Sequence, residues 1–166
     1  MLRDKSLIPL SHQHQHALAL CVRVDRAQPI PVEDLRPWLE EIERDFAPEF
    51  QNHFSVEESV LFPAARRFPE LIPLVEELIV EHAALRKCFS RAGARTMSAE
   101  TLPEFARQLS MHIRKEERQL FERLQQLMTT GELADLGVQL ATNLRVAERS
   151  CSVPSEATRL KRKARV

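Results

Sequence analysis

Two ten-residue segments of the chain share one spacing of histidine, glutamate, leucine and phenylalanine. The first is HFSVEESVLF, starting at His53, and the second is HIRKEERQLF, starting at His112. Residues four apart lie on one face of an α-helix, so each segment would place its histidine and its first glutamate on the same side. An ionised carboxylate that faces a helical core is costly unless it is paired or binds a metal. The duplication therefore predicts two helices that contribute matching halves of one buried site.

Helix-breaking residues and the periodicity of the hydrophobic residues divide the chain into four long amphipathic segments and a shorter fifth. Helices are predicted over residues 11–25, 32–67, 70–91, 102–128 and 132–149. Pro48 predicts a kink or short break in the second helix. Thr101 and Glu104 match a capping box for the fourth, and Gly93 and Gly131 are expected just past helix ends. Short connections between long helices favour an all-α fold, an antiparallel up-down-up-down four-helix bundle with a short fifth C-terminal helix.

The length, charge and cysteine count of the chain limit the class of protein to which it can belong. The 166 residues suit one domain, expected over residues 1–150, followed by a disordered basic tail over residues 151–166. Lys plus Arg and Asp plus Glu are each 24, so the balanced charge gives no reason to expect nucleic acid or an acidic membrane as a partner. Cys21, Cys88 and Cys151 are widely spaced and odd in number, which is typical of reduced thiols in a cytoplasmic protein.

Each of the four long helices places one histidine on its inward stripe, read at steps of three and four. The candidate ligands on these stripes are His14, His53, Glu57, His82, His112 and Glu116. The second stripe is expected to continue at Val60, and the fourth at Gln119 or Leu120 and then at Arg123. Four imidazoles and two carboxylates in one core predict a di-metal site. Nitrogen and oxygen donors without a thiolate suit iron or manganese, and zinc is also compatible.

Two points stay open from the residues alone. His12 and His16 share a face of the first helix, while His14 points nearly opposite and continues the apolar stripe. His14 is therefore the predicted ligand, with His16 as the alternative and His12 exposed. Glu58 and Glu117 follow the candidate glutamates but are turned about 100° away, so they are either outer hydrogen-bond partners of the histidines or surface charges.

Four segments in order, LSHQHQHAL, HFSVEESVLFP, IVEHAALR and HIRKEERQLF, resemble the bacterial hemerythrin-like domain, also called the HHE cation-binding domain. The resemblance covers about residues 7–128, and it implies two irons bridged by Glu57, Glu116 and a solvent oxygen. It assigns the ligand positions to His14, His53, Glu57, His82, His112 and Glu116.

The chain also departs from the oxygen-carrying members of that family. They have a further histidine four residues from the first on the third helix, where this chain has Leu78 and Arg86. They commonly end in a His-x-x-x-x-Asp pair, where this chain has His112-x-x-x-Glu116. Gln13 stands where relatives often have a glutamate. The missing ligand leaves at least one iron open, which favours relatives that sense oxygen or nitric oxide or handle iron over reversible oxygen carriers.

Three functions follow as hypotheses. The favoured one is a non-haem di-iron protein that binds or senses oxygen, nitric oxide or peroxide, or handles iron. The second is a peroxidase-like or oxidase-like di-iron enzyme or an iron-centre repair protein, although the chain has no tyrosine and Trp38 lies far from the motif. The third is a partner-binding bundle with a structural metal, in which the fifth helix or the basic tail forms contacts such as a homodimer interface.

Overall fold

The computed structural model describes residues 2–144, 156, 158 and 159, and every element in these residues is helical. The α-helices are α1 (Ile8–Arg26), α2 (Val32–Glu41), α3 (Ala47–Val56), α4 (Phe62–Ala65), α5 (Ile72–Gly93), α6 (Thr101–Lys115), α7 (Phe121–Leu127) and α8 (Thr130–Leu144). Between them lie the π-helical segments η1 (Ile42–Phe46), η2 (Glu57–Leu61) and η4 (Glu116–Leu120), and the 3-10 turn η3 (Pro69–Leu71). The predicted all-α class is confirmed.

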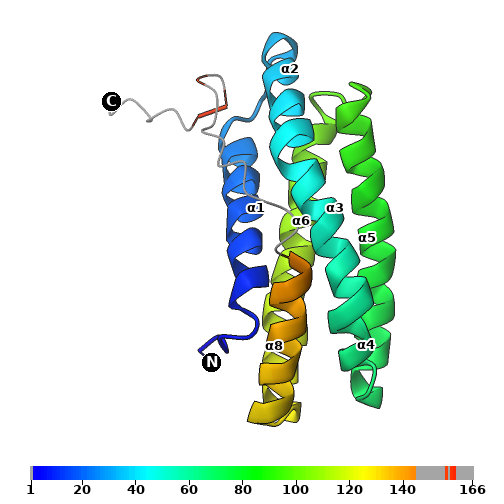
Figure 1. Cartoon of the computed structure of the whole chain (residues 1–166). Helices are drawn as coiled ribbons and strands as arrows, with labels where there is room; N and C mark the ends of the chain where they lie inside the picture. The colour runs from blue at the N-terminus through cyan, green and yellow to red at the C-terminus, as the bar shows by residue number, and fades with distance from the viewer. Residues whose placement is uncertain (1, 145–155, 157, 160–166) are drawn as a thin grey trace, which may run out of the picture.

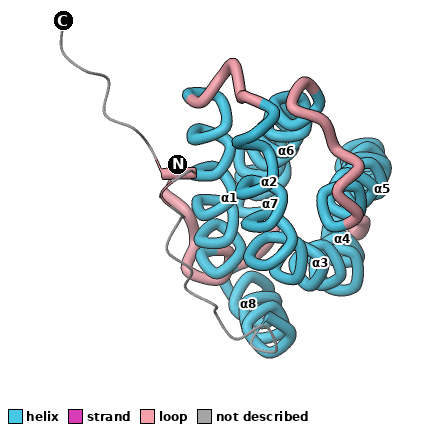
Figure 2. The backbone as a smooth tube through the Cα atoms, turned by 90° about the horizontal axis from the view of Figure 1, so that it is seen from above, coloured by secondary structure: helices cyan, strands magenta, loops and turns pink. Residues whose placement is uncertain are grey.

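Four rods run side by side along the long axis (Figure 1). They are α1, the continuous run from α2 to α4, α5, and the run from α6 to α7. The colour order in Figure 1 shows successive rods running in opposite directions, with short connections at the two ends. Figure 2 shows α8 outside these rods, beside α1 and α3, both of which it contacts. None of the helices in the described part of the chain is both long and apolar enough to cross a bilayer.

The break predicted at Pro48 takes the form of the π-helical segment η1. Proline has no backbone N–H to donate to the preceding turn, so an unbroken α-helical ladder cannot pass through it. The backbone N–H of Ala47, directly before the proline, donates to the carbonyl of Ile42, five residues back. The wider turn keeps the rod continuous down to His53.

Each copy of the repeated motif contains a π-helical segment that begins at its first glutamate. The N–H of Phe62 donates to the carbonyl of Glu57, and the N–H of Phe121 donates to the carbonyl of Glu116. One extra residue per turn shifts the phase of everything that follows. As a result the adjacent leucine and phenylalanine of both motifs are all buried.

This phase shift corrects two predicted core positions. Val60 is only partly buried and Leu61 takes the core position, because the expected stripe assumed an unbroken period of 3.6 residues. Likewise Arg123 is exposed and Leu124 is buried. Of the two alternatives at the preceding turn, Leu120 is the buried residue and Gln119 is exposed.

Predicted helix ends differ from the observed ones in detail. Ser98 rather than Thr101 begins the capping box of α6: the Ser98 N–H donates to Thr101 Oγ1 at 2.9 Å, and the Thr101 N–H donates to Ser98 Oγ at 3.4 Å. Glu104 does not reach back to the helix start but binds Arg107. Serine is preferred over threonine as an N-cap, and Ser98 directly precedes the turn that leads into the helix.

The two glycines expected beyond helix ends lie inside helices. Gly93 is the last residue of α5, and the left-handed residue that ends the helix is Arg95, at φ 58°. The N–H of Thr96 donates to the carbonyl of Arg91 at 2.9 Å, which is the bond of a Schellman motif. Gly131 lies in the first turn of α8.

Helix α8 covers one half of the bundle through Leu133, Leu136, Leu140 and Leu144. Residues 145–149 of the predicted fifth helix lie outside the described residues. Gly137 allows a close approach, because a Cβ atom there would stand 2.7 Å from Cβ of Ser6. The glycine therefore lets the N-terminal segment pass directly against α8.

The predicted tail over residues 151–166 lies outside the described residues, apart from Glu156, Thr158 and Arg159. Thr158 is buried. Its carbonyl accepts a hydrogen bond from Arg23 at 3.0 Å, and its hydroxyl donates to Glu41, which also pairs with Arg23. This part of the C-terminal region is thus held against α1 and α2.

The apolar core forms two clusters. One includes Ala17, Leu85 and Leu109, and the other includes Leu10 and Leu78. On α1 and α5 the two clusters meet on either side of the inward histidine. A polar layer therefore separates the two halves of an otherwise apolar interior.

Candidate metal centre

The structure brings all six predicted side chains together in the polar layer. Each is at most 2 % exposed. Two groups of potential donors share both carboxylates: the first is His14, His53, Glu57 and Glu116, and the second is Glu57, His82, His112 and Glu116. Within each group the donor atoms lie within 4.8 Å of one another. Two ligands on opposite sides of one ion are about 4.2 Å apart when each bond is about 2.1 Å, so small side-chain movements suffice to close either group on an ion.

Both carboxylates reach histidines of both groups. Glu57 Oε1 lies 3.2 Å from His53 Nε2, and Glu57 Oε2 lies 3.4 Å from His82 Nε2. Glu116 Oε2 lies 3.2 Å from His14 Nε2 and 3.4 Å from His112 Nε2. The repeated motif therefore supplies two carboxylates that lie between the two groups of histidines.

Each histidine is held by its outward-facing nitrogen. The Nδ1 contacts are His14 with Glu117 at 2.7 Å, His53 with Gln13 at 2.7 Å, His82 with Glu58 at 2.8 Å and His112 with Glu81 at 2.8 Å. Every acceptor belongs to a different rod from the histidine that it holds. The four contacts form a closed ring, because each rod supplies one acceptor to the next histidine.

These outer partners determine which ring nitrogen carries the proton and which one faces the centre with a lone pair. A carboxylate can only accept, so a histidine that bonds one through Nδ1 carries its proton there. The Nε2 lone pair of the neutral ring then points inward and is free to bind a cation. Such outward bonds to carboxylate or carbonyl oxygens are the usual support of metal-binding histidines.

The interior atoms lack partners of their own. Both oxygens of Glu57 and of Glu116, and Nε2 of His82 and of His112, have no hydrogen-bond partner among the described residues. Buried polar atoms are seldom left unpaired in folded proteins, because each costs free energy. A divalent cation in each group would satisfy all of them, so the donor set fits a pair of metal ions.

In the metal-free centre, burial and the contacts between the buried side chains shift their pKa values. Burial lowers the pKa of His14, but contacts with Glu116 and Glu117 outweigh it and raise the pKa to about 9. Burial also lowers the pKa of His82, and Glu116 and Glu57 raise it to about 10. Burial and the charge of Glu116 raise the pKa of Glu57, yet His53 and His82 bring it down to about 2. Protons on the imidazoles thus balance the carboxylates where a cation would otherwise do so.

Aromatic rings cover the centre on several sides. Phe54 stacks on His82 with 4.1 Å between ring centroids, and Phe62 lies against the same imidazole at 5.3 Å. Phe121 stacks on His14 at 5.5 Å. These side chains are fully buried, so they keep bulk water away from the donor atoms.

The residues that the sequence left open lie in different surroundings. His14 lies in the first group, while His16 is half-buried and bonds Glu49, and His12 is exposed. Leu78 belongs to the core and Arg86 binds Glu58 at 2.7 Å, so neither adds a ring nitrogen to the centre.

Sequence reasoning noted Gln13 only as a departure from relatives, not as a partner of His53, and it missed Glu81 altogether. Glu81 holds His112 and also pairs with Lys115. A usable signal existed, because each outer acceptor directly adjoins a candidate ligand in the sequence, as Glu81 adjoins His82.

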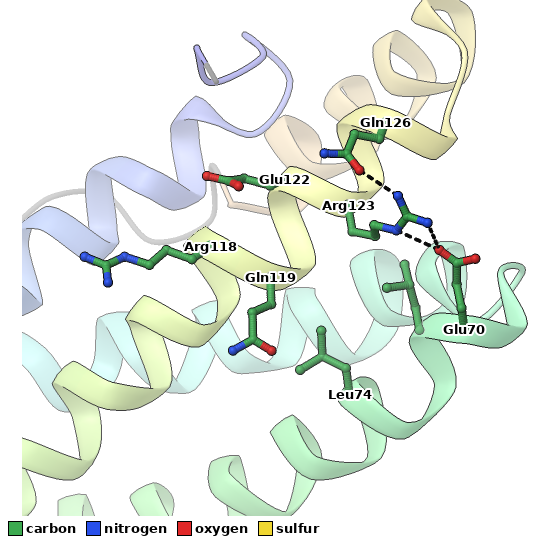
Figure 3. Close-up of a pocket in the computed structure, with 8 residues that line it drawn as sticks. Glu70, Leu74, Arg118, Gln119, Glu122, Arg123 and Gln126 are labelled. Carbon is green, nitrogen blue, oxygen red and sulfur yellow. Dashed lines mark hydrogen bonds and ion pairs between the residues drawn. The ribbon is translucent and has the colours of Figure 1, made fainter.

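A separate pocket of about 380 Å³ opens at the surface near the start of α5 and the end of the fourth rod (Figure 3). Arg123 crosses it and bonds Glu70 and Gln126. None of the six candidate ligands lines this pocket, so it is distinct from the polar layer.

Comparison with known proteins gives one family. The model of the family described as the hemerythrin HHE cation binding domain matches residues 9–134, which include all six side chains of the polar layer. No curated protein and no solved structure gives a significant match.

Proposed function

The chain belongs to the hemerythrin HHE cation-binding family, and from this premise we propose that it binds two iron ions and uses them to bind or sense a small ligand such as oxygen, nitric oxide or peroxide. The proposed ligands are His14, His53, Glu57, His82, His112 and Glu116.

One observation carries this proposal. The histidines turn Nδ1 outward to fixed acceptors, while carboxylate oxygens and inward-facing nitrogens lie buried in two four-donor groups. Cys21 and Cys88 belong to neither group, so the donors are nitrogen and oxygen alone. This set suits iron or manganese and also accommodates zinc.

The donor count leaves room for a further ligand. Each group offers two imidazole nitrogens and one oxygen from each shared carboxylate. A six-coordinate ion would therefore keep about two positions for solvent or a small molecule. Bound iron would supply redox chemistry and these open positions.

The protein's own residues prepare the site for such a ligand. Glu58, Glu81, Glu117 and Gln13 fix the imidazole rings, which removes the need to order them when the ion binds. Phe54, Phe62 and Phe121 pack against the histidines and keep bulk water from the donor atoms. A centre enclosed by fully buried rings favours a diatomic molecule or peroxide over a larger substrate.

The test is reconstitution of tag-free protein with Fe(II) under anaerobic conditions. Elemental analysis is expected to give about two irons per chain, and exposure to oxygen or nitric oxide is expected to produce new absorption bands near the visible region. Protein that takes up no iron, or that shows no spectral change with either gas, would contradict the proposal.

A matched pair of variants locates the first-helix ligand. His14→Ala removes a donor of the first group and is expected to lower iron content and abolish the bands. His16→Ala removes an imidazole two residues away that contacts Glu49, and iron content should stay at the wild-type level. The reverse result would make His16 the ligand.

A further inference from the structure

The four outer acceptors of the histidines differ in charge. Glu58 pairs with Arg86 at 2.7 Å, Glu117 pairs with Arg3 at 2.6 Å, and Glu81 pairs with Lys115. The fourth acceptor, Gln13, is a neutral amide. Three histidines are thus supported by a carboxylate and one, His53, is not.

This difference separates the two groups of donors. In the second group both histidines, His82 and His112, bond a carboxylate through Nδ1. In the first group His14 does so, but His53 bonds only the amide of Gln13. A carboxylate on Nδ1 raises the basicity of the ring and strengthens Nε2 as a metal donor. The second group is therefore the stronger site.

A second observation points the same way. Nε2 of His14 and Nε2 of His53 lie 3.0 Å apart, close enough for one shared proton to satisfy both. Nε2 of His82 and of His112 have no such partner among the described residues. The two imidazole nitrogens of the first group contact each other directly, whereas Nε2 of His82 and Nε2 of His112 face only the carboxylates of Glu57 and Glu116, at 3.4 Å each.

Gln13 also permits this contact between the two imidazole nitrogens. A carboxylate only accepts, so it fixes the proton of its histidine on Nδ1. An amide both donates and accepts, so Gln13 can turn and support either tautomer of His53. The His53 ring can therefore share its proton with His14 or present a lone pair to an ion.

We propose that Gln13 is a positioning residue that makes the two metal positions unequal, so that the His82–His112 position fills first and the His14–His53 position takes up and releases its ion. This inference rests on the proposed two-metal function. It gives the chain one firmly held ion and one exchangeable ion.

The test is a titration of the metal-free protein with Zn²⁺, monitored by calorimetry in the presence of a competing chelator. Zinc suits four nitrogen and oxygen donors and is redox-silent. Wild-type protein is expected to bind two ions in separate steps of unequal affinity. Gln13→Glu supplies the missing carboxylate, and it is expected to tighten the weaker step by about tenfold to a hundredfold and leave the tighter step unchanged.

Two further variants complete the comparison. Gln15→Glu introduces the same charge at an exposed position two residues away, and neither step should move. Glu81→Gln replaces the carboxylate behind His112 by an amide, and it should weaken the tighter step and leave the weaker one. Circular dichroism establishes that each variant keeps the wild-type helical content.

The outcomes separate the inference from the function on which it rests. Equal affinities in the wild type, or a Gln13→Glu variant that behaves like Gln15→Glu, would overturn the role of Gln13 and leave two-metal binding intact. Failure of the wild type to bind a second ion under any condition would overturn the two-metal function and the inference together.

Discussion

Phe54 shows how a single residue serves both the core and the centre. Its ring is fully buried, stacks on His82, and meets His112 edge-on at 5.8 Å. On its outer side lies the guanidinium of Arg86, 5.4 Å from the ring centroid. The same side chain therefore fills volume and shields two candidate ligands from water.

Phe54→Ala is expected to destabilise the metal-free protein by about 3–5 kcal/mol, because it removes a buried ring and leaves a cavity. Urea denaturation followed by circular dichroism measures the change. Val80→Ala is the control, since Val80 is 70 % exposed and its truncation should cost less than about 0.5 kcal/mol. Equal midpoints for the two variants would show that the Phe54 ring contributes little to the core.

Residue-level prediction from the sequence succeeded for the inward positions and was incomplete for the outer ones. The helical period alone placed all six polar residues on inward stripes. It left Glu58 and Glu117 undecided and missed Glu81, because residues turned about 100° from the stripe point into the grooves between helices. Whether such a residue meets a histidine depends on which rod lies next to it, and periodicity within one helix does not contain that information.

The π-helical segments are the main feature of the elements that a constant period could not predict. The segment η2 begins at Glu57 and makes Leu61 and Phe62 both face the core. The sequence signal was present as the adjacent Leu-Phe pair that ends each motif, which a period of 3.6 residues does not explain. In contrast, the break at Pro48 was predictable because proline removes a specific hydrogen bond.

Deletion of Val60 tests whether the extra residue of η2 is needed. The shortened segment is expected to return to a regular α-helix with Leu61 and Phe62 still facing the core, because removal of one residue offsets the change to the narrower α-helical turn, and its unfolding free energy should match that of Val60→Ala. Val60→Ala is the control, because it removes most of the same half-buried side chain and keeps the residue count. A deletion variant that loses about 2–4 kcal/mol more than Val60→Ala would mean that the wide turn itself is needed for the packing that follows it.

The start of α8 gives the fold a defined pH response. Glu132 accepts a hydrogen bond from the Thr129 N–H at 2.9 Å, and Thr129 Oγ1 accepts one from the Glu132 N–H at 3.2 Å. The bond to the Thr129 backbone and the pairing with Arg67 lower the pKa of Glu132 to about 2. A lowered pKa means that the stabilisation is complete above the ordinary value of 4.5 and is lost as the pH falls from there toward 2.

The wild-type protein is therefore expected to lose stability between pH 5 and pH 3 more steeply than Glu132→Gln, whose side chain does not titrate. Urea midpoints at a series of pH values measure the difference. Thr129→Ala, which removes the hydroxyl half of the box, should cost about 1 kcal/mol at neutral pH. Parallel pH profiles for wild type and Glu132→Gln would contradict the role of this cap.

For the whole molecule, the two apolar clusters are joined across a layer of buried polar atoms. Ions bound there would link all four rods, so metal removal is expected to lower the thermal midpoint. At a free metal concentration a thousandfold above the dissociation constant, binding adds about 4 kcal/mol. For a chain of this size that corresponds to roughly 10 °C.

Differential scanning calorimetry with and without chelator measures this shift. His112→Ala should lose most of it, and His16→Ala should keep it. A thermal midpoint that does not depend on metal in the wild type would show that the polar layer is stable without ions.

The contact at Gly137 extends the influence of α8 beyond the surface that it covers. The N-terminal segment that passes this glycine at Ser6 also carries Arg3, whose guanidinium bonds Glu117, and Glu117 in turn bonds the imidazole of His14. A short series of contacts thus connects α8 with His14 in the interior. A methyl group added at residue 137 would displace the segment and loosen Arg3, so a helix without any candidate ligand influences the position of the His14 imidazole.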